Sequence, residues 1–555
     1  MLELELEFDD EFELEFDEEF DDELDDWFDD ELELELDDWS SVRCWSRGLG
    51  SCGPQRTGRR QLGGHPMSGL NRRTFLAGAA MGTATATTVG GPFAGFLAGP
   101  AAATGSAPQP TLGPVADARD GLVRLWLPAG FAYRSFHDTE SPVTLDDGTV
   151  LPGRHDGMAA FRGRRGRVLL VRNQEVNNPG PAFGDSSQAY DAMGQGGTTT
   201  VEVTRFGEVV SAFTSLNGTQ MNCSGGATPW GSWITCEETV NGPDVGPDFT
   251  GVSNVPLTQP HGYIFEVPAG GQSSREPITK AGRFAHEAVA LDPLFGTLYL
   301  TEDNFGFPSG FYRYKPRRHP LLTRSLRNDG RLQMLAVVGR PNADLAASQP
   351  RGASYRVRWV DIEDPDPTFP FTPGQPAPTT NDTALNHVGA QGRAQGAAGF
   401  SRLEGATYDR GTVYFCSTQG GGPPETGTSD PIGGWGNGTG QIWAYDTFHQ
   451  RLRLVFESPG VETLDFPDNV TTSRRGTLIL CEDSTGDNFL RGLSPRGELW
   501  DIALNRLVSN TGTPRLGDEF AGATFSPDGH TLFVNIQASR GITFAIWGPW
   551  GRVGV

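Results

Sequence analysis

Residues 222–239 read NCSGGATPWGSWITCEET, and the rest of the chain is organised around this stretch. A thiol and a Gly-Gly pair precede a Thr-Pro turn signal, and a short β-prone run then ends in Glu237 and Glu238. Glycine lets backbone approach a ligand closely, and two carboxylates without a neighbouring Lys or Arg need another counter-charge. A hairpin with surface acids is the plain alternative. The recurrence of the same arrangement downstream favours a binding site.

The charge of the chain is concentrated at its N-terminus. The 555 residues have a formal net charge of −25, and the first 39 hold 23 of the 69 Asp and Glu with neither Lys nor Arg. The other 46 acids nearly balance the 44 basic side chains, so the body lacks the basic footprint of a nucleic-acid-binding protein. Dense like charge opposes a packed core. We predict that residues 1–66 are a low-complexity, disordered extension, and the signal that follows leaves open whether the mature protein carries it.

An export signal follows this extension. Residues 71–76 read NRRTFL, and small apolar residues continue to Ala-Ala-Ala at 101–103. Twin arginines with this setting are typical of a twin-arginine signal peptide, which we place at 67–103. The stretch is too interrupted to predict a stable membrane span. We therefore expect the twin-arginine export machinery as a partner, and a periplasmic or secreted domain at 104–555.

Four cysteines follow the signal: Cys223, Cys236, Cys416 and Cys481. An even number in an oxidising compartment permits disulfides, and a bridge from Cys223 to Cys236 across one hairpin is an open alternative. The four lack the spacing of a zinc finger.

Short β-prone runs separated by turn residues fill the body of the chain, without a long helical period. The clearest runs are 167–171, 297–301, 412–416, 441–445, 477–481 and 531–535. A unit of turn, glycine, apolar run and terminal acid recurs at 292–303 and 474–483. Such units fit the blades of a β-propeller, so the predicted class is all-β. Longer Pro- and Gly-rich interruptions at 242–258, 340–395 and 419–438 are predicted to be loops on one face.

Acidic residues recur at seven strand edges. They are Glu175, Glu237-Glu238, Glu287, Glu404, Asp468-Asn469, Glu482-Asp483 and Asp518-Glu519. In a propeller, such positions from different blades converge on the central channel. Clustered carboxylates with amide oxygens are the ligands that Ca²⁺ requires. Each acid alone is more often a solvated turn residue, but the repeated context favours metal binding for the set.

Arg402 precedes Glu404 by two residues, so on a strand both side chains point to the same face. An arginine among metal-binding acids suits a phosphate or carboxylate through paired hydrogen bonds. An ion pair between Arg402 and Glu404 is the alternative. His286 is a further possible ligand, although a histidine beside an apolar run is more often a core residue.

Several blocks resemble the PhoX family of alkaline phosphatases, in the right order across nearly all of residues 115–555. The blocks are 222–239, 283–288, 403–406, 467–469, 519–529 and 541–550. The resemblance implies a monomeric β-propeller of about six blades that hydrolyses small phosphate monoesters. It also implies a site with two ferric ions bridged by an oxo group, together with calcium ions.

The same resemblance assigns roles to individual residues. Cys223 is expected to be a thiolate ligand to iron, Glu287 and Glu404 to bind iron or calcium, Glu175, Asp468 and Asn469 to bind calcium, and Arg402 to hold the phosphate. The expected catalytic set is thus Arg402, Glu404 and Cys223. Gln174 stands where the family pattern has histidine, which is a departure at the first metal position.

Two other classes of function stay open from the sequence. One is a propeller lactonase or esterase that needs calcium but not iron. The other is a non-catalytic, calcium-bound propeller that presents a binding face to a partner.

Overall fold

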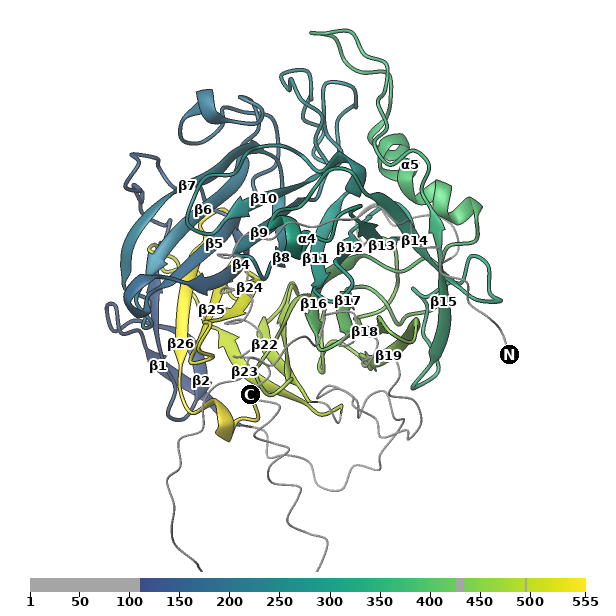
Figure 1. The fold of residues 1–555 in the computed structure, drawn as a ribbon. Coiled ribbons are helices and arrows are strands. Elements are labelled where there is room, and N and C mark those ends of the chain that lie inside the picture. The colour runs from purple at the N-terminus through teal and green to yellow at the C-terminus, as the bar shows by residue number, and fades with distance from the viewer. Residues whose placement is uncertain (1–109, 426–433, 495–496) are drawn as a thin grey trace, which may run out of the picture. The chain divides into compact units, whose positions relative to one another are not determined.

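The computed structural model describes residues 110–425, 434–494 and 497–555, which all lie in the second of the chain's two units, Thr87–Val555. The predicted acidic extension and export signal lie outside the described residues. Within them the chain is a β-propeller, as predicted, with only two α-helices (Figure 1). No helix in these ranges is both long and apolar enough to cross a membrane.

Six strands form a closed inner ring in the described part of the chain. They are β4 (His155–Arg162), β8 (Asn222–Ala227), β11 (His286–Asp292), β16 (Leu403–Asp409), β20 (Pro467–Thr472) and β24 (Phe520–Phe525). Each packs against the next, and β24 packs against β4, which closes the ring. The ring accounts for the repeat seen in the sequence, because the units at 292–303 and 474–483 each cover the turn after an inner strand and the second strand of the same sheet.

Antiparallel strands extend outward from each inner strand. After β4 come β5 (Val168–Gln174), β6 (Gly196–Val203) and β7 (Val209–Thr219). After β8 come β9 (Ser232–Glu237) and β10 (Ile264–Pro268), and after β11 come β12 (Thr297–Glu302), β13 (Phe311–Lys315) and β14 (Arg331–Val337). After β16 come β17 (Thr412–Ser417), β18 (Gln441–Asp446) and β19 (Arg451–Glu457). After β20 come β21 (Leu478–Glu482), β22 (Phe489–Leu493) and β23 (Leu499–Asn505), and after β24 come β25 (Thr531–Ile536) and β26 (Ile542–Trp547).

The first strands of the described chain complete the last two sheets. β3 (Ala132–Phe136) pairs with β26, while β1 (Leu112–Ala116) and β2 (Val123–Pro128) extend the sheet beyond β23. Strands from the two ends of the domain therefore close the ring together. The additional strand β15 (Ser354–Asp361) pairs with both β14 and β19, which joins two neighbouring sheets into one.

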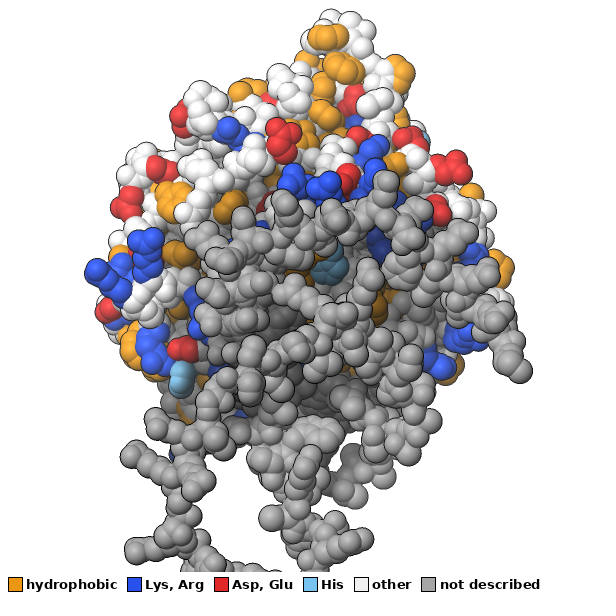
Figure 2. Space-filling view, viewed as in Figure 1, with side chains coloured by type: hydrophobic (Ala, Val, Ile, Leu, Met, Phe, Trp, Pro, Cys, Tyr) orange, Lys and Arg blue, Asp and Glu red, His pale blue; other side chains and the backbone are white. Residues whose placement is uncertain are grey.

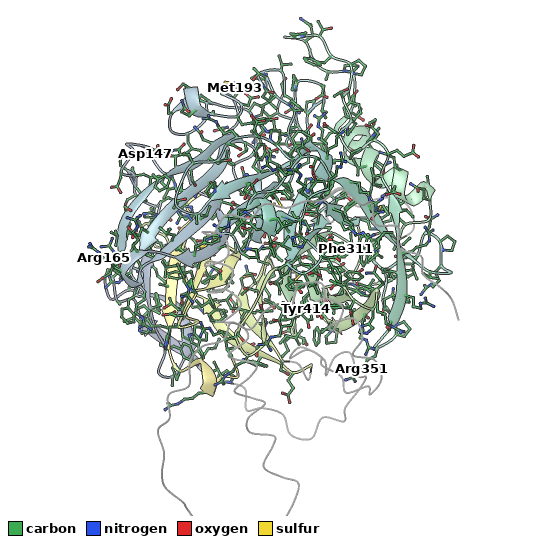
Figure 3. All side chains as sticks on the ribbon, viewed as in Figure 1. Asp147, Arg165, Met193, Phe311, Arg351 and Tyr414 are labelled. Atoms are coloured by element: carbon green, nitrogen blue, oxygen red, sulfur yellow. The ribbon has the colours of Figure 1, made fainter. Side chains whose placement is uncertain are left out.

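The hydrophobic core lies between neighbouring sheets. Phe311 on β13 is fully buried, and its ring stacks on Phe415 of β17 with the ring centroids 4.3 Å apart. In Figure 3, Phe311 lies among the strands, whereas Asp147 and Arg165 lie at the periphery. The six apolar runs singled out in the sequence fall in β5, β12, β17, β18, β21 and β25, as predicted.

The interruption at 340–395 was predicted to be a loop, and this prediction is wrong in part. It contains β15 and the helix α5 (Asn381–Ala394), which begins after Thr380, whose side chain accepts a hydrogen bond from the N–H of Thr383. Only Ala384, Val388 and two glycines of α5 are buried. Such a narrow apolar face leaves little helical periodicity in the sequence, and the helix depends on packing against the sheet. The remaining short helices are α4 (Pro320–Thr323) and single turns at Arg164–Gly166, Ser186–Gln188, Thr279–Ala281 and Trp550–Arg552.

Charged side chains of both signs are interspersed on the described face visible in Figure 2. This mixed surface agrees with the near-neutral composition of the body.

Candidate active site

Each inner strand carries a β-bulge near its start, where the pairing with the second strand shifts register. In five of the six strands, the second residue enters the bulge and is a carboxylate or a thiol. These residues are Asp156, Cys223, Glu287, Glu404 and Asp468. A bulge re-aims side chains locally. One structural device, repeated around the ring, therefore presents the ionisable groups.

Gly157, Ser224, Ala288 and Gly405 follow four of these five residues, and small residues are needed there because the inner strands approach one another closely. A Cβ added at Gly157 would lie 2.6 Å from the Cα of Ser224 on the neighbouring strand. A Cβ at Gly405 would lie 2.7 Å from the Cα of Asn469 in the same way. No side chain fits at such distances, so these glycines allow the bulges to converge.

A second layer of polar residues directly follows the second strand of each sheet. It consists of Glu175, Glu238, Asp303, Thr418, Asp483 and Gln537. The N–H of each donates to the carbonyl of the residue two positions before the second residue of the inner strand, over 2.9–3.2 Å. The acceptors, which belong to the same six sheets, are Arg154, Met221, Ala285, Arg402, Phe466 and Glu519. Two layers of side chains thus face the same space.

The acid pairs that stood out in the sequence divide into two roles. Glu237 turns into its own sheet, where it accepts hydrogen bonds from the N–H groups of Gly262 (2.9 Å) and Tyr263 (3.1 Å). Glu302 and Glu482 do the same in later sheets, with Tyr312 (2.8 Å) and Arg491 (2.9 Å) as partners. Because successive residues of a strand face opposite sides, the second acid of each pair joins the site.

Three overlapping groups of ligand atoms cross the site. They are Cys223 with Glu238 and Glu287, then Glu287 with Glu404 and Asp468, then Asp468 with Asp483 and Glu519. Within each group, the ligand atoms lie within 4.8 Å of one another. The shared Glu287 and Asp468 make the three groups continuous. A thiolate with carboxylates suits a transition metal, and carboxylates alone suit a hard cation such as Ca²⁺.

Two arginines face these acids. Arg402 donates through Nε and Nη2 to Asp303 (3.0 and 2.7 Å), and through Nη2 to Glu404 at 3.0 Å. Its guanidinium also lies 4.1 Å from the ring centre of Phe305. The ion pair considered from the sequence is therefore present, but it is shared with a second acid. Arg154 donates to Glu175 through Nε at 2.8 Å and also through Nη2.

The described residues give this site many more carboxyl groups than basic groups. Its carboxylates are Asp156, Glu175, Glu238, Glu287, Asp303, Glu404, Asp468, Asp483 and Glu519, against two guanidinium groups. Burial, reinforced by neighbouring acids, raises the pKa of Glu238, Glu287 and Glu404 well above its ordinary value. The same causes raise the pKa of Asp468 to about 7. Uncompensated charge of this kind is costly in a buried site, so the donor set fits multivalent cations.

The predicted site residues do not all behave alike. Cys223, Glu287, Glu404 and Asp468 lie in the ligand groups, whereas Glu175 is bonded to Arg154. Asn469 donates to Asp468 (2.6 Å), and its Oδ1 accepts from the N–H of Gly522 at 2.5 Å, which links β20 to β24. Their predicted roles as metal ligands stay predictions.

His286 and Gln174 are structural residues in this site. His286 stacks on Phe284 with 3.6 Å between ring centres, its Nε2 lies 2.9 Å from the carbonyl of Gly282, and burial lowers its pKa to about 3. The Oε1 atom of Gln174 is hydrogen-bonded to Nδ1 of His155 at 2.9 Å, and its Nε2 donates to the hydroxyl of Thr199 at 3.1 Å. The family pattern has histidine at position 174, but the Gln174 side chain present here is hydrogen-bonded to His155 and Thr199, which are residues of neighbouring strands in the same sheet.

Sequence reasoning missed several members of the site. Asp156 and Asp303 were not selected, and Arg154 was not considered as a partner for Glu175. Asp156 follows His155 as Glu287 follows His286, so the pattern was present in the sequence but was not recognised. Aligning the six units on their strand starts would have placed it beside Cys223 and Glu287.

All four described cysteines are free thiols, so the alternative of a hairpin disulfide is wrong. The Sγ of Cys223 lies 3.3 Å from the carbonyl of His286 and 3.6 Å from that of Glu287 on the next inner strand. Burial, with Glu287 and Glu238 nearby, raises the pKa of this thiol. Cys223 therefore needs a cation beside it to become a thiolate.

The fold and the site define a β-propeller whose inner strands and the residues next to them bring together three groups of side chains that could hold metal ions. The chain belongs to the family of the alkaline phosphatase PhoX, whose model matches residues 111–213 and 208–539. It is accordingly a phosphatase, and the lactonase, esterase and binding-module alternatives are not favoured. No curated protein sequence matches the chain.

The chain is also similar to several solved structures. Pseudomonas fluorescens PhoX in complex with vanadate, a transition state analogue, is 18% identical over 80% of this chain and 98% of that one, with a TM-score of 0.55. A gluconolactonase from Xanthomonas campestris is 12% identical over 75% and 97%, with a TM-score of 0.34. Virginiamycin B lyase from Staphylococcus aureus is 11% identical over 75% and 99%, with a TM-score of 0.33.

Proposed function

We propose that this phosphatase hydrolyses small phosphate monoesters outside the inner membrane, at a centre that holds two ferric ions bridged by an oxo group together with calcium ions. The observation that carries the proposal is the continuous set of three ligand groups beside Arg402. The thiolate group of Cys223, Glu238 and Glu287 suits iron, and the two carboxylate groups suit calcium. Cations bound there would neutralise phosphate oxygens and lower the barrier to attack by water.

Arg402 is the residue that we assign to the phosphate. Its Nε and Nη2 are engaged by Asp303 and Glu404, which fixes the plane of the guanidinium. Among the described residues, its Nη1 has no hydrogen bond and can therefore donate to a phosphate oxygen. Although burial lowers it, the pKa of Arg402 is raised by Asp303 and Glu404, so the side chain stays cationic at alkaline pH.

Elemental analysis of the exported protein, together with a phosphomonoester assay, tests this proposal. We expect iron and calcium in the purified protein, a visible thiolate-to-iron absorption, and hydrolysis that is lost with the metals. Calcium without iron, or a metal-free protein that hydrolyses the ester at the full rate, would contradict the assignment.

Replacing Arg402 by lysine is expected to weaken phosphate binding. Lysine keeps the charge but lacks the planar fork, so both the fixed orientation and the free N–H are lost. We expect kcat/KM to fall by roughly 100-fold, on the scale of losing one donor to the reacting group. Inhibition by vanadate should weaken in parallel.

A matched control is Arg124→Lys. Arg124 lies on strand β2, outside the ligand groups, and donates two similar hydrogen bonds to Asp120 (2.7 and 2.8 Å). This variant is expected to lose some stability and to keep its vanadate affinity. Equal vanadate affinity in the Arg402→Lys and Arg124→Lys variants would remove Arg402 from the phosphate site.

We also propose that residues 67–103 direct export through the twin-arginine machinery and that the mature domain acts as a monomer in the periplasm or after secretion. If residues 1–66 contribute nothing to the fold, a chain that starts at Met67 should keep both export and thermal stability. Melting curves and cell fractionation measure the two properties. A large fall in the melting temperature of the exported domain would contradict this expectation.

A further inference from the structure

The second strand of each sheet carries one residue beside the bulge of its inner strand. This residue lies two positions before the polar residue that follows the second strand. These residues are Asn173, Cys236, Thr301, Cys416, Cys481 and Asn535. Two of them are asparagines that reach the neighbouring inner strand. Asn535 on β25 donates to the carbonyl of Asp156 at 2.5 Å, and Asn173 on β5 donates to the bulge of β8.

Asn173 is fully buried, and its amide makes four hydrogen bonds. The Nδ2 group donates to the carbonyls of Cys223 and Ser224, both at 2.8 Å. The Oδ1 atom accepts from the indole of Trp233 and from the hydroxyl of Thr235, both at 2.9 Å. Both N–H donors and both lone pairs of the amide are thereby used.

The two carbonyls that Asn173 binds belong to the bulge itself. Regular pairing between β8 and β9 is interrupted between Asn222 and Gly225, so Cys223 and Ser224 lie outside the regular register. A buried carbonyl without a partner is costly. By satisfying both carbonyls from a neighbouring sheet, Asn173 fixes the backbone that directly follows the Cys223 side chain.

We propose that Asn173 is a positioning residue that holds the β8 bulge so that the Cys223 thiolate points at the metal centre. This inference rests on the proposed function, because it assigns a support to the thiolate ligand. Trp233 and Thr235 orient the amide from the same hairpin that carries Cys223. The sequence offers no sign of this role, since Asn173 lies 50 residues before its partner.

The variant Asn173→Asp tests the proposal. The carboxylate keeps an acceptor for Trp233 and Thr235 but places an oxygen against the two bulge carbonyls. We expect metal affinity at the thiolate group to fall roughly 10- to 100-fold, as for other residues that orient ligands, with loss or displacement of the thiolate-to-metal absorption. We also expect alkylation of Cys223 in the intact protein, followed by mass spectrometry, to become faster.

The matched control is Asn217→Asp. Asn217 is also buried, and its Nδ2 donates to two carbonyls, those of Phe183 (2.7 Å) and Asp185 (3.0 Å), which lie outside the ligand groups. This variant should lose stability without a change in the absorption or in Cys223 alkylation. If Asn173→Asp does not fold, Trp233→Phe removes one hydrogen bond to the same amide and should increase the alkylation rate by a smaller factor.

Different results would contradict the proposed function and the positioning role of Asn173. A wild-type protein without iron or phosphatase activity would remove the proposed function, yet the alkylation rates would still report on the bulge. If Cys223 in Asn173→Asp or in Trp233→Phe is alkylated no faster than in Asn217→Asp, the positioning role is wrong.

Discussion

Replacing Cys223 by alanine is expected to remove the iron, the colour and most of the hydrolysis, whereas Cys236→Ala is expected to keep all three. The two cysteines share one hairpin and are both buried, but only Cys223 lies in a ligand group, with Glu238 and Glu287. Losing a direct ligand should reduce kcat/KM by roughly 100-fold or more, since even residues that only orient ligands cost 10- to 100-fold. Metal analysis, the visible spectrum and a phosphomonoester assay measure the effects.

The comparison of the two variants also tests whether Cys223 and Cys236 are free thiols. Cys236→Ala deletes one buried sulfur, so its cost should be confined to stability, at about 1–2 kcal/mol. Equal loss of metal in both variants, with a wild-type mass two hydrogens below that of the reduced chain, would show that the pair forms a disulfide and would remove Cys223 from the metal centre.

The propeller was predictable because its strands are short, apolar and bounded by turn residues. Residues 412–416 and 531–535 predicted β17 and β25 closely, since each is buried and flanked by glycine or a turn. The helix α5 was not predictable in the same way. Its stability comes from packing against β14, and its sequence contains Gly389 and Gly392.

The site was only half predictable, and the β-bulges are the reason. Acid pairs such as Glu237 and Glu238 were visible in the sequence, but a pair does not reveal which member faces the channel. Alternation along the second strand decides this, whereas a bulge on the inner strand shifts the alternation there by one residue. Asp156 lies in such a bulge, which the register between β4 and β5 reveals. The contacts of Asn173 and Asn469 link neighbouring sheets, and no local pattern encodes them.

Removing the metals is expected to destabilise the protein increasingly as the pH rises from 5 to 8. In the metal-free site, burial and neighbouring acids raise the pKa of Asp468 to about 7, and they raise the pKa of Glu287 and Glu404 well above its ordinary value. A carboxyl group whose pKa is raised by folding contributes its full stability below its unfolded pKa, near 4, and loses it as the pH rises through the folded value. Bound cations favour the ionised form, so the metal-loaded protein should not show this loss.

Thermal unfolding with and without a strong chelator, at each pH from 5 to 8, measures the effect. The difference in melting temperature should be smallest at pH 5 and widen toward pH 8. Asp468→Asn is the matched variant, because it removes one of the carboxyl groups that destabilise the metal-free fold. The raised pKa of Asp468 corresponds to about 4 kcal/mol. The metal-free variant should therefore be more stable than the metal-free wild type at pH 8, by an amount on that order, and the two should converge at pH 5. A metal-free wild type that is as stable at pH 8 as at pH 5 would show that the acids of the inner strands are compensated without cations.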